Sequence, residues 1–191
     1  MIRKFIFITT LLLSFISADI GLGIILEEGE GGFTFGSNLT YIPKKPSSGE
    51  LLENFRTINS SILLPSGIEL LYGKDSEFDD NYLGLNYHLK HNNYTISFNF
   101  KKNYDNSIMY RPKELGGTIA WKVKKQKIIP FFKYTFKSSK FNNNYELFTF
   151  GGIISYFRMI FTFSYTFPSG DFQGLYNGKG NININSGLYL N

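Results

Sequence analysis

The stretch YTISFNFK, from Tyr94 to Lys101, alternates strictly between apolar and polar side chains. In an extended chain successive side chains point to opposite faces, so Tyr94, Ile96, Phe98 and Phe100 share one face and Thr95, Ser97, Asn99 and Lys101 share the other. This period of two predicts a β-strand with one apolar face. The apolar face can meet either a protein core or lipid, and the rest of the sequence has to decide between them.

The same alternation recurs along the chain, and its segments predict an all-β meander of ten strands in a single domain. The other segments are 32–41, 57–64, 68–73, 82–90, 115–124, 130–137, 146–156, 160–167 and 181–190. Short and long connections alternate along the chain. The short turns fall at 65–67, 91–93, 125–127 and 157–158, and the longer polar connections fall at 43–54, 74–80, 103–114, 138–144 and 168–180. One end of the sheet should therefore be trimmed, while the other end carries the long loops.

The composition agrees with β structure in one domain. The chain has 191 residues with 20 Phe and 13 Tyr, and strands favour aromatic residues. Its formal net charge is +5, but the Lys and Arg residues are scattered along the chain, so we do not expect nucleic acid as a partner.

The first 18 residues have the pattern of a secretory signal. Arg3 and Lys4 precede an apolar run from Phe5 to Ser17, and Ala18 suits the position before cleavage. The run is shorter than the roughly 20 residues of a spanning helix, which favours a signal over an anchor. We therefore expect an exported barrel domain over residues 19–191, and its lack of cysteine means that it needs no disulfides.

Three features favour lipid over a soluble core. The polar faces carry mainly Thr, Ser, Asn and Gly, which suit a crowded, hydrated lumen, and no charge falls in the middle of an apolar face. Aromatic residues recur near the segment ends, where girdles at the two membrane interfaces would need them. Because lipid forbids open sheet edges, such a sheet must close into an antiparallel, up-and-down transmembrane β-barrel.

Three long stretches together resemble the small outer-membrane β-barrel proteins of Gram-negative bacteria, the OmpA- and OmpX-like group in a broad sense. They are YLGLNYHLKHNNYTISFNFK (82–101), GGTIAWKVKKQKIIPFFKYTFK (116–137) and FGGIISYFRMIFTFSYTF (150–167). The resemblance implies the outer membrane as location, its lipid and the barrel assembly machinery as partners, and long loops that face outward and can bind an extracellular ligand. Such barrels usually end on an aromatic residue, whereas this chain has Leu190 and Asn191 there.

The strand number depends on one further segment. DIGLGIIL (19–26) also alternates, with Ile20, Leu22, Ile24 and Leu26 set against two glycines. Bacterial single-chain barrels have even strand counts. We expect ten spanning strands, with eight or twelve as alternatives, and residues 19–26 as a short strand that does not span.

The candidate site is a set of charges on the polar faces of the strands. Glu69, Lys122 and Lys133 fall on strands that can face one another across a small barrel, and lone charges in an interior need partners. They predict a Glu–Lys network that fills the lumen, with separate solvation of each charge as the alternative. His88 and His91 are expected to be solvated polar residues. Nothing in the pattern predicts a catalytic, metal or cofactor site.

These features favour a non-enzymatic outer-membrane barrel with a structural or surface-interaction role. A barrel of about ten strands is mostly filled by its own side chains, which argues against a wide channel. Two alternatives stay open: a narrow passive pore or transport barrel, and a soluble, lipocalin-like periplasmic barrel that binds lipid.

Overall fold

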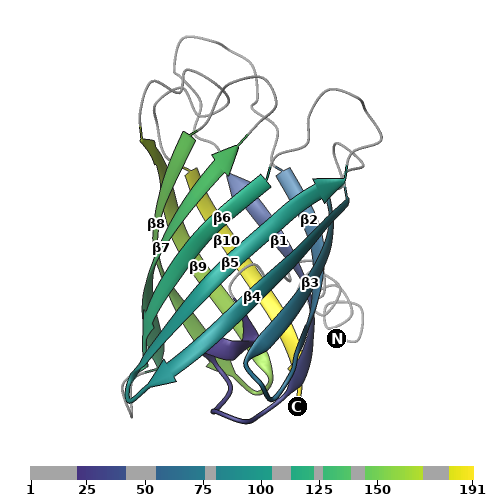
Figure 1. The fold of residues 1–191 in the computed structure, drawn as a ribbon, viewed down its shortest axis with the longest axis vertical. Helices are drawn as coiled ribbons and strands as arrows, with labels where there is room; N and C mark the ends of the chain where they lie inside the picture. Colours follow the sequence, from purple (N-terminus) through teal and green to yellow (C-terminus); the bar gives the residue numbers. More distant parts are fainter. Residues whose placement is uncertain are drawn as a thin grey trace, which may run out of the picture.

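The computed structural model is an antiparallel barrel of ten strands, preceded by one turn of 3-10 helix (Figure 1). It describes residues 21–41, 55–75, 81–104, 113–122, 127–138, 145–169 and 181–191. The helix is η1 (Leu22–Ile24), and the strands are β1 (Gly32–Tyr41), β2 (Phe55–Leu63), β3 (Ile68–Asp75), β4 (Asn81–His91), β5 (Tyr94–Tyr104), β6 (Lys113–Trp121), β7 (Ile128–Ser138), β8 (Tyr145–Tyr156), β9 (Met159–Ser169) and β10 (Asn181–Leu190). The predicted all-β class and strand number are both confirmed.

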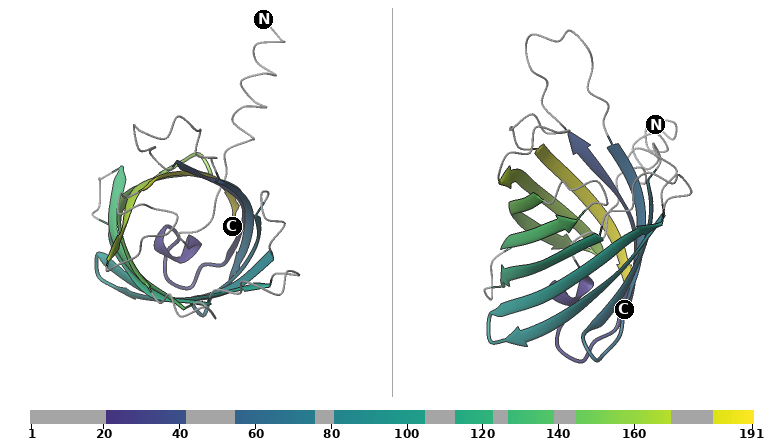
Figure 2. Two further views of the ribbon diagram at one scale, coloured as in Figure 1. Left: turned by 90° about the horizontal axis from the view of Figure 1, so that it is seen from above. Right: turned by 45° about the horizontal axis from the view of Figure 1, so that its top comes forward.

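Every strand pairs with its neighbours in the sequence, and β1 closes the barrel by pairing with β10 (Figures 1 and 2). At this seam Phe33 lies opposite Leu190, and Gly36 lies opposite Gly187. The closed order leaves no strand edge unpaired, so the backbone donors and acceptors of the strands find partners within the sheet. The up-and-down topology is the one that the alternating connection lengths predict.

The two faces of the sheet are reversed relative to a soluble protein. In β5, Tyr94, Ile96, Phe98 and Phe100 point outward and are 41–56% exposed, whereas Thr95 and Ser97 are buried inside the barrel. The other strands follow the same rule, with Thr, Ser and Asn side chains buried in the interior. The apolar face of the opening stretch therefore points away from the interior of the molecule.

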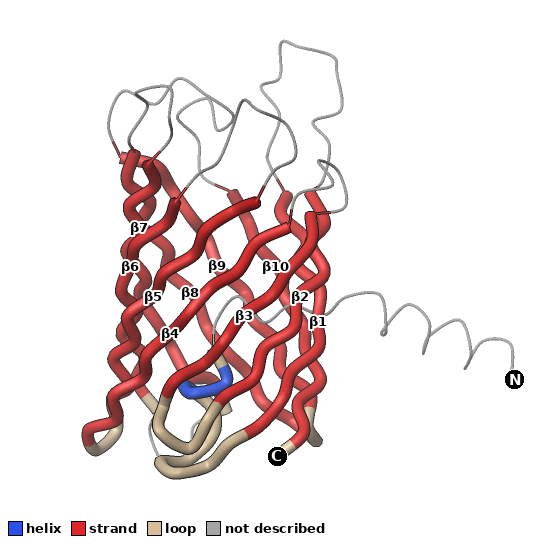
Figure 3. Tube along the Cα trace, turned by 45° about the vertical axis from the view of Figure 1, so that its right-hand side comes forward, coloured by secondary structure: helices blue, strands red, loops and turns tan. Residues whose placement is uncertain are grey.

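The chain that precedes β1 lies inside the barrel near the short turns (Figures 2 and 3). Residues 21–26, which we call the plug, are all buried there. The apolar plug residues pack against inward-facing apolar side chains of the wall: Leu63, Ala120, Ile129, Phe131, Ile153 and Ile160. The interior thus has an apolar region at one end and a polar region above it.

The plug corrects the expectation of a short strand over residues 19–26. Residues 22–24 form a turn of 3-10 helix, in which the N–H of Ile25 donates to the carbonyl of Leu22 at 2.9 Å. A strand here would need a free edge, and the closed barrel has none to offer. Residues 19 and 20 lie outside the described residues, as does the expected signal over residues 1–18.

The four short connections lie at the plug end of the barrel. The β2–β3 turn contains Gly67 at φ +81°, and the β4–β5 turn contains Asn92 at φ +53°. The β8–β9 turn consists of Phe157 and Arg158, at φ +45° and +63°. Within the described residues no helix is long and apolar enough to cross a membrane.

Candidate functional site

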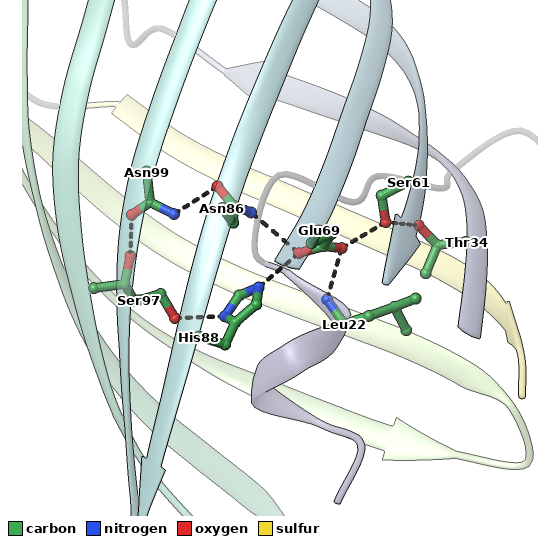
Figure 4. A network of polar contacts seen from close by, with 9 residues as sticks. Leu22, Thr34, Ser61, Glu69, Asn86, His88, Ser97 and Asn99 are labelled. Carbon is green, nitrogen blue, oxygen red and sulfur yellow. Dashed lines mark hydrogen bonds and ion pairs between the residues drawn. The ribbon is translucent and has the colours of Figure 1, made fainter. Parts of the chain in front are cut away.

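Glu69 is the centre of the polar interior (Figure 4). Its side chain points inward from β3 and is fully buried, with 0% exposure. One carboxylate oxygen accepts hydrogen bonds from the backbone N–H of Leu22 at 2.9 Å and from the Ser61 hydroxyl at 2.6 Å. The other accepts from the Asn86 amide at 3.1 Å and lies 2.9 Å from His88 Nε2. Because a buried carboxylate is costly unless it is paired and hydrogen-bonded, these four contacts explain how it is tolerated.

His88 links the carboxylate to the next strand. Its Nε2 faces Glu69, while its Nδ1 lies 2.7 Å from the Ser97 hydroxyl on β5. A carboxylate only accepts, so Nε2 carries the proton in this contact. The expectation that His88 is solvated is wrong, because its position in β4 turns it into the lumen, where it is 5% exposed. His91 ends β4 and is exposed, as expected.

The chain Ser97–His88–Glu69 has the connectivity of a nucleophilic triad, but it lacks access. Ser97 is 0% exposed, and the plug glycines lie directly against the imidazole. A Cβ at Gly23 would fall 2.2 Å from His88 Cδ2, so there is no space beside the ring for a reacting carbonyl group. The arrangement therefore holds strands and plug together, and it offers no site where a substrate could reach the hydroxyl.

Further hydrogen bonds extend the network around the barrel wall. The Asn99 amide donates to Asn86 Oδ1 at 2.8 Å, and the Thr118 hydroxyl donates to Asn99 Oδ1 at 3.0 Å. On the other side, the Ser61 hydroxyl lies 2.7 Å from that of Thr34. The side chains meet because inward positions coincide in the antiparallel register: Glu69 is the direct partner of Asn86, and Asn86 that of Asn99. The network thus ties β1 through β6 together.

The structure does not bring the three predicted charges together. Among the described residues, Glu69 forms its ion pair with His88. Lys122 lies just beyond β6, and its ammonium group donates to the carbonyl of Ile25 at 2.8 Å and to Glu27 at 2.6 Å. Lys133 lines a pocket together with Lys101 and Glu114, and this pocket borders Asn86 and Asn99 of the Glu69 network. Glu69 and Lys122 nevertheless share one role, since each holds a different point of the plug.

The position of His88 on the polar, inward face of its strand was a signal for its burial beside Glu69, although a histidine is commonly expected to be solvated. Glu69 and His88 both occupy inward positions, and the register of β3 against β4 pairs Glu69 with Asn86, which places His88 two residues farther along the same inward face. The same alternation along the strands predicts that the side chains of Ser61, Asn86 and Ser97 also point inward. Leu22 could not be placed this way, because its donor comes from the plug and not from a strand. In the described ranges no group of three or more His, Asp or Glu residues could hold a metal ion.

Comparisons with known proteins found a weak structural similarity. No protein-family model matches the chain, and no curated protein sequence is similar to it. The structure is similar to that of Ail, the attachment invasion locus protein of Yersinia pestis, crystallised in complex with the heparin analogue sucrose octasulfate. The match covers 84% of this chain and 97% of that one, with 7% sequence identity and a TM-score of 0.25. At this level it does not assign the chain to a family.

Proposed function

We propose that this chain is a small outer-membrane β-barrel that is plugged by its own N-terminal segment and has a structural or surface-interaction role. The observation that carries the proposal is the apolar outer face, which runs around the barrel on all ten strands. Phe35, Leu83, Phe98, Leu115 and Phe163 are among its members and are 49–56% exposed. Monomeric soluble proteins rarely expose contiguous apolar patches larger than a few hundred Å², so a face of this extent requires an apolar surrounding.

The polar interior of the barrel also supports a membrane as the surrounding of the outer face. A lipocalin-like barrel would need an apolar, open cavity to bind lipid inside. Here the interior holds buried Thr, Ser and Asn side chains, and the apolar cluster near the short turns is already filled by Leu22 and Ile24 of the plug. Fractionation separates the two proposals: we expect the protein in the outer membrane, and recovery in the soluble periplasmic fraction would contradict a membrane barrel.

Migration in gels provides a second test. A membrane barrel resists unfolding in detergent without heating, so an unheated sample should migrate differently from a boiled sample of the same chain. Identical migration before and after boiling, together with a soluble fraction, would overturn the proposal. A single band at full length in the boiled lane controls for degradation.

The plug and the Glu69 network argue against a conducting lumen. The plug residues are buried among the wall residues near the short turns, and the Glu69 network ties the plug to the wall of β1 through β6. We therefore propose that transport is not the role of this barrel, and planar-bilayer recordings of the wild-type chain should show no channel steps. Regular steps would instead favour the narrow pore.

Interaction through the loop end is the role that remains for a closed, non-catalytic barrel. The strand ends that the long connections join lie opposite the plug, as the strand order and the short turns require. The inaccessible Ser97 hydroxyl is the reason that we propose no catalysis. Outer-membrane lipid and the barrel assembly machinery are the partners that this proposal requires, and an extracellular ligand would be bound by the loops.

A further inference from the structure

The β8–β9 turn places bulky residues where the backbone favours glycine or asparagine. Phe157 and Arg158 both have positive φ, at +45° and +63°, the geometry of a two-residue hairpin turn. This region is unfavourable for bulky L-residues, and natural hairpins usually place Asn or Gly there. The comparable β4–β5 turn of this barrel follows the rule with Asn92. The identities of Phe157 and Arg158 are therefore not explained by the turn that they form.

The side chain of Phe157 extends the outer apolar face at the plug end. It is 81% exposed, and its ring meets that of Tyr156 in a T-shaped contact with centroids 4.4 Å apart. Tyr156 is 64% exposed and shares the outward parity of β8 with Phe150. The two rings thus mark the edge of the apolar face, where the membrane interface would lie.

Arg158 adds a positive charge beside this aromatic pair. Its side chain is exposed and forms no ion pair or hydrogen bond with another described residue. Its carbonyl accepts a hydrogen bond from the N–H of Tyr189 at 2.9 Å, which fixes the turn against β10. The guanidinium group is thus carried on a backbone held at two sides. Lys127, at the next short connection, is also exposed.

We propose that Tyr156, Phe157 and Arg158 form a binding site for an anionic phospholipid at the short-turn rim of the barrel. The inference rests on the proposed membrane location and assigns a lipid class to one part of its surface. Aromatic rings prefer the level of the headgroups, and a guanidinium group binds phosphate through paired N–H donors. A zwitterionic lipid offers the same phosphate but also a positive group, which Arg158 would repel.

The test uses a variant that improves the turn while it removes the site. Phe157→Asn with Arg158→Gly gives the favoured residues of this turn type, so the hairpin should be retained and the barrel should resist heat at least as well as the wild type. Lys113→Gln is the matched control, because it removes one exposed positive charge at the loop end of β6. All three proteins are used as the full mature chain, and native mass spectrometry counts the bound phosphatidylglycerol or phosphatidylcholine of equal acyl length.

The wild type and Lys113→Gln should retain phosphatidylglycerol about fivefold better than phosphatidylcholine, the effect of roughly one basic residue near an anionic surface. The double variant should lose this preference while its gel migration still shifts on boiling. An unchanged preference in the double variant, or none in the wild type, would overturn the site even if the barrel inserts normally. A wild type without lipid preference would also fit a turn that binds a protein instead of a lipid. Failure of all three proteins to insert into lipid would instead contradict the membrane location itself.

Discussion

Glu69 is a carboxylate in a barrel interior, where an ionised group is stable only because donors surround both of its oxygens. Two of the donors, Asn86 and His88, lie on β4, a third is Ser61 on β2, and the fourth is the backbone N–H of Leu22 in the plug. The same side chain therefore fixes the wall and the occupant of the lumen. Its removal should affect both at once.

Glu69→Ala should lower the free energy of unfolding by about 3–5 kcal/mol, the usual cost of breaking a buried ion pair from one side. His88, Asn86 and the Leu22 N–H would be left without their acceptor in a region that excludes water. Urea titration in detergent micelles measures the loss. Glu27→Ala is the control, because the Glu27–Lys122 pair is 73% and 38% exposed and should be worth only about 0–1 kcal/mol. Equal, small effects of both variants would contradict the central role of Glu69.

Gly23 is the second residue on which the interior depends. An added Cβ would lie 2.2 Å from His88 Cδ2, and the imidazole is held by hydrogen bonds on both nitrogens. Gly23→Ala should therefore push the plug away from the wall and destabilise the barrel by about 1–3 kcal/mol, as overpacked interiors do. The midpoint of thermal unfolding checks this. Gly117→Ala serves as the control, since its Cβ would meet nothing closer than 3.7 Å, and a shift as large there would contradict the steric account.

At the level of elements, the plug and the strands are specified in different ways. Each strand follows from its period of two, and β1, β5 and β10 begin at the first residue of the alternating segments that predict them. The plug sequence alternates as well, yet residues 22–24 form a 3-10 helix, because the pairing of β1 with β10 leaves it no partner strand. Periodicity describes what a segment can form, but the closure of the whole sheet decides whether it can pair.

The same distinction explains what could be predicted about the site. The inward direction of Glu69 and Lys122 follows from strand parity, and the need of Glu69 for partners follows from its burial. The partners themselves depended on register, which places His88 beside Glu69, and on the plug, which brings Glu27 and the carbonyl of Ile25 to Lys122. Contacts between neighbouring strands were thus within reach of sequence reasoning, whereas contacts to an irregular segment inside the barrel were not.

Removal of the plug side chains tests its role as a closure. Leu22→Ser with Ile24→Ser replaces two side chains that are each 1% exposed and lie among the apolar wall residues. Polar groups without partners in this region should dislodge the plug and admit water at the short-turn end. Planar-bilayer recordings should then show brief, small channel steps that the wild type lacks. A silent variant that still shifts on boiling would contradict the role of these two side chains in closing the lumen.

For the whole molecule, the central question is which solvent surrounds the outer face, and a charge placed at different depths can answer it. Phe98 lies near the middle of β5 and is 56% exposed, whereas Tyr94 begins the same strand, stacks on Trp121 with ring centroids 6.1 Å apart, and is 48% exposed. In water, Arg would be tolerated about equally at both positions. In a bilayer, Phe98→Arg should cost about 2–4 kcal/mol, because the charge lies near the midplane, while Tyr94→Arg near the interface should cost about 0–1 kcal/mol.

Folding into lipid vesicles, followed by urea titration, measures this difference between the two variants. Because both residues point outward from one strand and both substitutions add the same side chain, strand propensity and total charge are matched. A cost that falls from the middle of β5 toward its short-turn end would place the apolar face in acyl chains. Equal costs at the two positions would contradict the bilayer as the surrounding of the apolar face.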